Sequence, residues 1–188
     1  MKQISQLGSV LKKHEIARDA VISNSRKIVQ LSKQVIFSLH RNGKVTDKVK
    51  TMQIAMRRLR RLVKNKPKLM YSGSYKIAEQ EFVEAMAYYH FTANGKIPSC
   101  KELGCDPEYY LLGICDFASE LVRTATQFAI DGNIPAVEVV KEFVARIHGE
   151  FLKLDLRGEL RKKSDMVRWS LKNLEDMVAH SRFNRGSA

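Results

Sequence analysis

The sequence has little cysteine, proline or glycine: three, four and ten residues respectively in a chain of 188. Disordered chains are typically rich in proline and glycine and poor in apolar residues, whereas 44% of this chain is apolar. This composition indicates an ordered, helical, globular protein. The chain is long enough to form a full hydrophobic core without disulfides or a structural metal. We therefore predict one domain over residues 1–188.

The three cysteines do not indicate a disulfide framework or a zinc site. Cys100, Cys105 and Cys115 are an odd number, and they lack the pair spacing of zinc ligands. We expect reduced thiols in a reducing compartment. Residues 1–13 lack the apolar block of a signal peptide, and no run approaches the ~20 apolar residues of a membrane span. The sequence therefore predicts a cytoplasmic protein that has no membrane partner.

Acidic residues are scarce in the first third of the chain. Residues 1–68 hold 18 Lys and Arg against three acids, while residues 69–188 hold 15 against 17, within a total formal charge of +13. Such asymmetry points to a polyanionic partner. A lysine-rich surface without a specific partner is the alternative.

The densest basic segment is residues 57–68, with seven Lys and Arg and no acid. Leu59, Leu62 and Val63 continue an apolar helical seam, so the outward positions are basic. Like charges at this density repel each other unless phosphates or counterions screen them. We predict that this face binds nucleic acid, and docking of an anionic protein is the alternative. The residues proposed for it are Arg57, Arg58, Arg61 and Lys64.

Aromatic residues are nearly absent from the basic third, where Phe37 stands alone among Phe, Tyr and Trp. A protein that binds single strands usually interleaves stacking rings with its basic residues. Their absence favours recognition of the phosphate backbone and of shape, as in duplex RNA.

Apolar residues recur with the helical period along almost the whole chain, and no alternating strand pattern of useful length is present. The sequence predicts an all-α bundle of six or seven helices. Some heptad seams are expected to bury against other copies of the chain, although all of them could be intramolecular core. The expected helices, as marked by their apolar residues, cover about residues 21–39, 45–63, 68–93, 107–130, 135–151 and 160–178. A short helical segment is expected at 100–104.

Three local signals mark helix ends. Gly43 is expected to supply the positive φ that closes the first helix. Asp106 suits an N-cap, and Pro107 suits the first helical position after it.

Two pairs of acids interrupt otherwise apolar helices. Glu81 and Glu84 are three residues apart and therefore share a face, and Tyr88 continues that line. Asp116 and Glu120 are four apart in the middle of the next long helix. If these consecutive helices pack antiparallel, the two pairs can face each other at mid-height.

Four converging carboxylates require compensation. Arg123 could neutralise some of them in a structural ion cluster. Alternatively, a hard divalent cation, Mg²⁺ or Mn²⁺, could lie between them and activate water for phosphodiester hydrolysis. The spacing leaves both solutions open. The lack of Glu-x-x-His disfavours a di-iron centre, and zinc prefers nitrogen and sulfur ligands. A helical nucleoside-triphosphate pyrophosphatase, which also uses Glu-x-x-Glu, remains a competing hydrolase.

Several segments together resemble the translin family, and within it the Trax (translin-associated factor X) type. The resemblance implies an all-α fold of about seven helices and closed oligomers, commonly octamers, that bind RNA and single-stranded DNA on basic inner surfaces. It further implies that Trax-type subunits supply Mg²⁺-dependent endoribonuclease activity. The matching segments are residues 25–41, 80–91 and 107–123, and the closing "FNRGSA".

The resemblance assigns roles to the acids. Glu81, Glu84 and Asp116 match the catalytic acids of the Trax type and would hold Mg²⁺, with Glu120 as a fourth ligand or as a partner of Arg123. The basic face would hold the RNA strand. The connection at residues 92–105 is much shorter than in Trax, and the "FNRGSA" ending differs slightly from the family's.

We therefore expect a metal-dependent endoribonuclease subunit. Its assembly would be a homo-oligomer, possibly octameric, or a hetero-oligomer with a translin-type subunit. The alternative is a non-catalytic ring that binds RNA or single-stranded DNA, in which the acids are structural ion pairs and Arg123 is buried.

Overall fold

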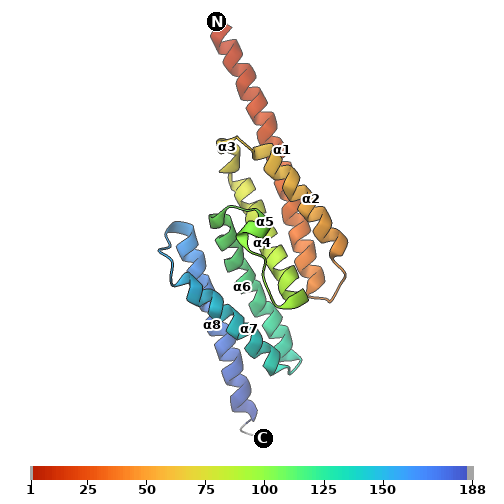
Figure 1. Ribbon diagram of the computed structural model, residues 1–188, viewed down its shortest axis with the longest axis vertical. Helices are drawn as coiled ribbons and strands as arrows, with labels where there is room; N and C mark the ends of the chain where they lie inside the picture. The colour runs from red at the N-terminus through yellow and green to blue at the C-terminus, as the bar shows by residue number, and fades with distance from the viewer. Residues whose placement is uncertain (1, 186–188) are drawn as a thin grey trace. The chain divides into compact units, whose positions relative to one another are not determined.

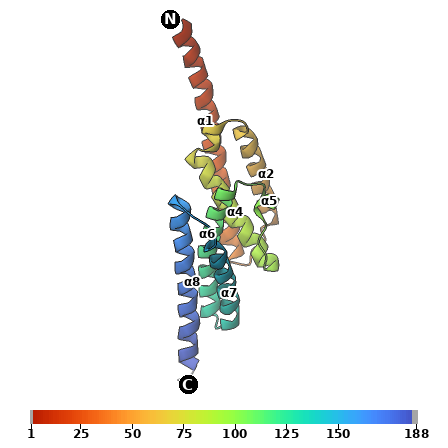
Figure 2. The same ribbon diagram turned by 60° about the vertical axis from the view of Figure 1, so that its left-hand side comes forward.

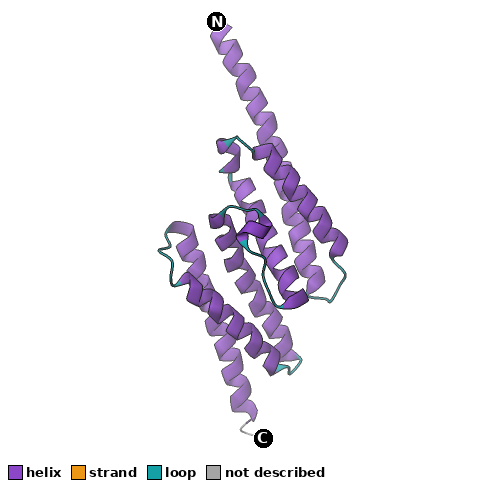
Figure 3. Cartoon of the chain, in the orientation of Figure 1, coloured by secondary structure: helices purple, strands orange, loops and turns teal. Residues whose placement is uncertain are grey.

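The computed structural model describes residues 2–185, and this part of the chain is helical without strands (Figure 3). Six helices are long and two, α3 and α5, have four residues each. The all-α prediction is confirmed. The helices are α1 (Lys2–Leu39), α2 (Thr46–Val63), α3 (Pro67–Met70), α4 (Gly73–Asn94), α5 (Cys100–Leu103), α6 (Pro107–Ile130), α7 (Ile134–Phe151) and α8 (Gly158–Arg185).

The described residues form two compact units that divide between Cys105 and Asp106. The first unit contains α1 to α5, and the second contains α6 to α8. Each unit has its own buried apolar side chains. The single domain expected over residues 1–188 stays a prediction.

In the first unit, α1 packs along α4 and α2 (Figures 1 and 2). The predicted seam of the second helix is the buried face of α2. Fully burying an apolar side chain of this size contributes roughly 1.5–3 kcal/mol relative to leaving it exposed, so this seam fixes which face of α2 is left for solvent. The seam residues, all buried, are Val45, Val49, Met52, Met56, Leu59 and Val63.

In the second unit, α6, α7 and α8 pack against one another. The Phe117 and Phe143 rings meet edge to face with centroids 6.1 Å apart. The predicted seam of α7 is buried throughout, and that of α8 is buried at three positions and half-buried at the others. The buried seam residues are Val137, Val140, Val144, Ile147, Phe151, Val167, Leu174 and Val178.

The start of α6 follows the prediction. Asp106 is its N-cap, with the side chain accepting a hydrogen bond from the Glu108 backbone N–H at 2.8 Å, and Pro107 takes the first helical position. This cap satisfies one of the backbone donors that every helix start leaves open.

The end of α1 corrects a prediction. The residue with positive φ is Asn42 (φ 54°), not Gly43. Asparagine tolerates this conformation better than most residues do. Gly43 is needed for a different reason: its N–H donates to the Ser38 carbonyl at 2.8 Å, and a Cβ on Gly43 would lie 3.1 Å from that oxygen.

The helix expected over 68–93 is interrupted near its start. A short α3 ends at Met70, and α4 begins at Gly73 behind the N-cap Ser72. The Ser72 hydroxyl donates to the Leu69 carbonyl at 2.7 Å and accepts from the Tyr75 N–H at 3.5 Å. One hydroxyl therefore bonds the end of α3 and the start of α4, which stabilises the break between the two helices.

The N-terminal part of α1 extends beyond α2 and α4 (Figures 1 and 2). Several large apolar side chains there are exposed, including Ile4, Leu7 and Leu11 at 61–72%. Their 3-4 spacing is in register with the buried α1 residues Val21 and Ile28, so the apolar seam continues past the packed region. None of the helices within residues 2–185 combines the length and apolar character that a membrane span requires.

Candidate functional site

The first acid pair lies in the middle of α4. Glu81 and Glu84 are both half-buried, between neighbours that are fully buried. Tyr88, one turn further, is buried, and its hydroxyl lies 3.2 Å from Nδ1 of His40, the residue that follows α1. The α4 backbone under the pair is therefore held firmly, while the two carboxylates keep partial access to solvent.

A third carboxylate of α4, Glu79, was missed by the sequence reasoning and is the one that meets an arginine. Its side chain is 1% exposed. It accepts hydrogen bonds from Nε and Nη2 of Arg60 at 2.8 and 2.6 Å, and from the Tyr75 hydroxyl at 2.5 Å. Nη1 of Arg60 donates to the Leu103 carbonyl at 2.6 Å. The bidentate pair thus joins α2, α4 and the end of α5.

The electrostatics of this network keep it charged and ordered. Burial opposes the charge of Arg60, but the hydrogen bonds and charge of Glu79 leave the pKa of Arg60 raised above its usual value. Burial, followed by the Glu79 charge, also raises the pKa of Tyr75, so its hydroxyl remains a donor. The network is structural, because each of its polar groups is hydrogen-bonded to another group of the protein.

The second acid pair lies in the middle of α6, with Asp116 and Glu120 side chains 30% and 20% exposed. Asp116 Oδ2 accepts a hydrogen bond from Nζ of Lys163 on α8 at 2.5 Å. Lys163 was not predicted as a partner. The adjacent Cys115 is a buried free thiol, and burial, assisted by the Asp116 charge, raises its pKa to about 12.

Arg123 does not take the position expected for a structural ion cluster. Its side chain is 60% exposed, and Nη1 lies 3.4 Å from Oε1 of Glu120, three residues earlier on the same helix. Exposed pairs of this kind contribute about 0–1 kcal/mol. The expectation of a buried Arg123 is therefore wrong, because its long side chain leaves the helix on the solvent side.

The chemistry of the four acids suits a hard divalent cation, since Mg²⁺ and Mn²⁺ prefer oxygen ligands and tolerate retained waters. Each unit supplies one pair: Glu81 and Glu84 from the first, Asp116 and Glu120 from the second. Within residues 2–185, no three His, Cys, Asp or Glu side chains are grouped as a metal ion would need. A site that uses all four acids therefore stays a prediction.

Three of the predicted basic residues lie on the face of α2 opposite its buried seam, and the fourth, Lys64, is the C-cap of that helix. Arg57, Arg58, Arg61 and Lys64 are all exposed, as predicted. We call these four residues the α2 basic face. Arg60, in the same segment, instead turns inward to Glu79.

A family model described as "Translin family" matches residues 16–181 and so runs through both units. An uncharacterised protein of Methanocaldococcus jannaschii is 27% identical over 175 residues, covering 89% of this chain and 78% of the relative. A translin-associated protein X homolog of Schizosaccharomyces pombe is 23% identical over 186 residues, covering 88% and 80%.

Solved structures share the fold. The crystal structure of apo-NeC3PO has a TM-score of 0.88 and 27% identity, covering 96% of this chain and 98% of that one. The AfC3PO–duplex RNA complex has a TM-score of 0.75 and 21% identity, covering 99% and 100%. The helical architecture described above is therefore that of these proteins.

Proposed function

This chain belongs to the Translin family, and from that premise we propose that it is a Mg²⁺-dependent endoribonuclease subunit. The observation that carries the proposal is the placement of the two acid pairs. Both lie at mid-helix, half-buried but reachable from solvent, on helices whose other faces are firmly packed. Two carboxylates that share such a position suit a divalent cation, which prefers oxygen ligands.

In this proposal Glu81, Glu84 and Asp116 hold the cation, Mg²⁺ or Mn²⁺, and Glu120 is a fourth ligand. When bound, the cation lowers the pKa of a coordinated water and offsets charge on the scissile phosphate. Lys163 donates a hydrogen bond to one oxygen of the Asp116 carboxylate and so competes with the cation for that oxygen. The packed face of α4 fixes the directions of Glu81 and Glu84.

RNA binding is proposed for the α2 basic face. Four exposed cations on one helical face suit the phosphate backbone, which carries no sequence information itself. The similar fold of AfC3PO, solved as a complex with duplex RNA, supports an RNA ligand. Single-stranded DNA is a further candidate, because the same phosphate contacts would hold it.

Assembly is proposed from the free end of α1. The exposed Ile4, Leu7 and Leu11 continue an apolar seam, and such faces usually mark interaction sites. A homo-oligomer such as an octamer, or a hetero-oligomer with a translin-type subunit, would cover them. The proposed compartment is the cytoplasm.

A second candidate function is a non-catalytic ring that binds RNA. It is favoured by the ion pairs of the α6 acids, since Asp116 already contacts Lys163 and Glu120 already contacts Arg123. In that case both acids would be structural.

The test is cleavage of a labelled RNA by the full chain with Mg²⁺ or with EDTA. The variants are Glu84→Gln and the matched control Glu175→Gln, which neutralises an exposed glutamate of α8. We expect Mg²⁺-dependent fragments from wild type and Glu175→Gln. We expect none from Glu84→Gln, which should still fold and bind RNA. Wild type that binds RNA but leaves it intact in Mg²⁺ would establish the non-catalytic function instead.

A further inference from the structure

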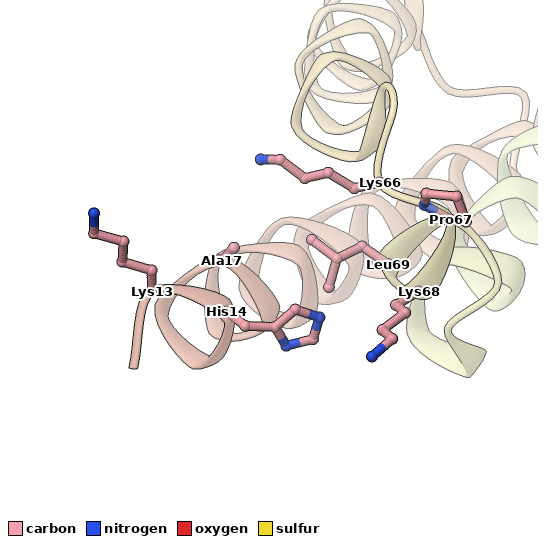
Figure 4. Close-up of a pocket in the computed structure, with 7 residues that line it drawn as sticks. All are labelled: Lys13, His14, Ala17, Lys66, Pro67, Lys68 and Leu69. Carbon is pink, nitrogen blue, oxygen red and sulfur yellow. The ribbon is translucent and has the colours of Figure 1, made fainter. Parts of the chain in front are cut away.

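The first unit has a pocket of about 650 Å³ beside the turn that leads into α3 (Figure 4). Its volume lies in the range of small-molecule sites. None of the residues that line it is acidic. They are Lys13, His14 and Ala17 from α1, and Lys66, Pro67, Lys68 and Leu69 from the turn and α3.

The pocket has an apolar floor. Leu69 is 2% exposed, so packing holds its position. Figure 4 shows the Leu69 side chain directed toward the α1 backbone at Ala17, with Pro67 behind it. The small side chain of Ala17 leaves this space open, since a larger one on the same face of α1 would enter it.

The rim of the pocket is cationic. Lys66 extends on one side of Leu69, and His14 and Lys68 lie on the other, while Lys13 projects from α1 (Figure 4). All four rim side chains are exposed, so the charges of the three lysines are available to a ligand. A ligand that fits must therefore be anionic at its edge and apolar in its body.

A nucleotide has this combination, because its base offers an apolar face and its phosphates are anionic. Bases inside a duplex are stacked and cannot reach such a floor, whereas unpaired nucleotides can be splayed out. A continuous duplex would contact only the lysines, leaving the floor unused.

The position of the pocket links it to the α2 basic face. Lys64, the last residue of that face, is two residues before Lys66 on the rim. A strand whose phosphates follow α2 would therefore reach the pocket at the end of the helix. We propose that this pocket binds one unpaired nucleotide of an RNA strand held on the α2 basic face. The inference rests on the proposed RNA binding and adds a preference among RNAs.

The experiment compares two RNAs by fluorescence anisotropy in EDTA: a blunt duplex and the same duplex with one unpaired terminal nucleotide. Wild type should bind the second about five-fold more tightly, as expected when one base covers part of the apolar surface at Leu69 and Pro67. Ala17→Leu fills the floor without changing charge or adding an aromatic ring, and Lys13→Gln removes one rim charge. Both should bring the ratio toward one, whereas Lys12→Gln, an exposed neighbour outside the pocket, should keep it.

The outcomes separate the two proposals. Equal, measurable affinity of wild type for both RNAs would overturn the pocket assignment and leave RNA binding intact. A preference that survives in Lys13→Gln and in Ala17→Leu would also overturn it, because the unpaired nucleotide would then bind elsewhere. No binding of either RNA would overturn the proposed RNA binding and, with it, this inference. Circular dichroism would verify that each variant folds.

Discussion

Lys163 Nζ on α8 lies 2.5 Å from Asp116 Oδ2 on α6. The two side chains are 21% and 30% exposed, so the pair is shielded from solvent only in part. A carboxylate cannot give the same oxygen fully to an ammonium group and to a divalent cation. The lysine is therefore a built-in competitor for any metal ion that Asp116 would bind.

Removing that competitor should tighten metal binding. We predict that Lys163→Met lowers the Mg²⁺ concentration for half-maximal RNA cleavage by several-fold, since a nearby positive charge is lost. Lys172→Met is the control, because Lys172 pairs with the exposed Asp176 on the same helix at 3.1 Å. An unchanged Mg²⁺ requirement in Lys163→Met would show that Asp116 does not bind the ion.

The Arg60–Glu79 pair should dominate the stability of the first unit. Glu79→Gln leaves Arg60 without its bidentate partner, so we predict a loss of about 3–5 kcal/mol in the free energy of unfolding. Glu81→Gln, two residues away and half-buried, should cost less than about 1 kcal/mol. Urea denaturation followed by circular dichroism measures both. Equal losses would mean that Glu81 belongs to the structural network.

Arg123 should be nearly dispensable for folding. Because its side chain is exposed and its contact with Glu120 is a surface pair, Arg123→Ala should change the free energy of unfolding by about 1 kcal/mol or less. A loss of about 3–5 kcal/mol would contradict this prediction and would support a structural ion cluster that includes Arg123.

Cys115 should make the protein sensitive to alkali. Its thiol pKa is about 12 in the folded chain against an ordinary value of 9.0, so the unfolded chain loses this proton first as pH rises. Stability is therefore complete below pH 9 and falls between pH 9 and 12, by at most about 1.4 kcal/mol per pH unit. Cys115→Ala should show a shallower decline in thermal melts over this range. Parallel declines would mean that the thiol has the same pKa in the folded and the unfolded chain.

The sequence predicted what depends on local spacing. The α2 seam and the cap at Asp106 follow from residues within a turn or two of one another, and both were found as expected. The prediction that Gly43 closes α1 with a positive φ was wrong by one position, because Asn42 takes that conformation instead. Helical period places side chains on a face but does not determine the chain reversal after it.

The site contacts depend on packing between distant segments. Lys163 and Asp116 are 47 residues apart, and Arg60 and Glu79 are 19 apart. One local signal for Glu79 existed: it is four residues after Tyr75, so the two share a helical face. Periodicity alone could not tell which of the three glutamates of α4 would meet Arg60.

The central claim is that the acid pairs of α4 and α6 share one divalent cation, and Mn²⁺ binding measured by electron paramagnetic resonance tests it most directly. The variants are Glu84→Gln and Asp116→Asn, one from each unit, with Glu175→Gln as the control. We predict one Mn²⁺ site per wild-type chain, lost in both variants and kept in the control. A site that survives in either variant would contradict the account, because the two pairs would then not hold the same ion.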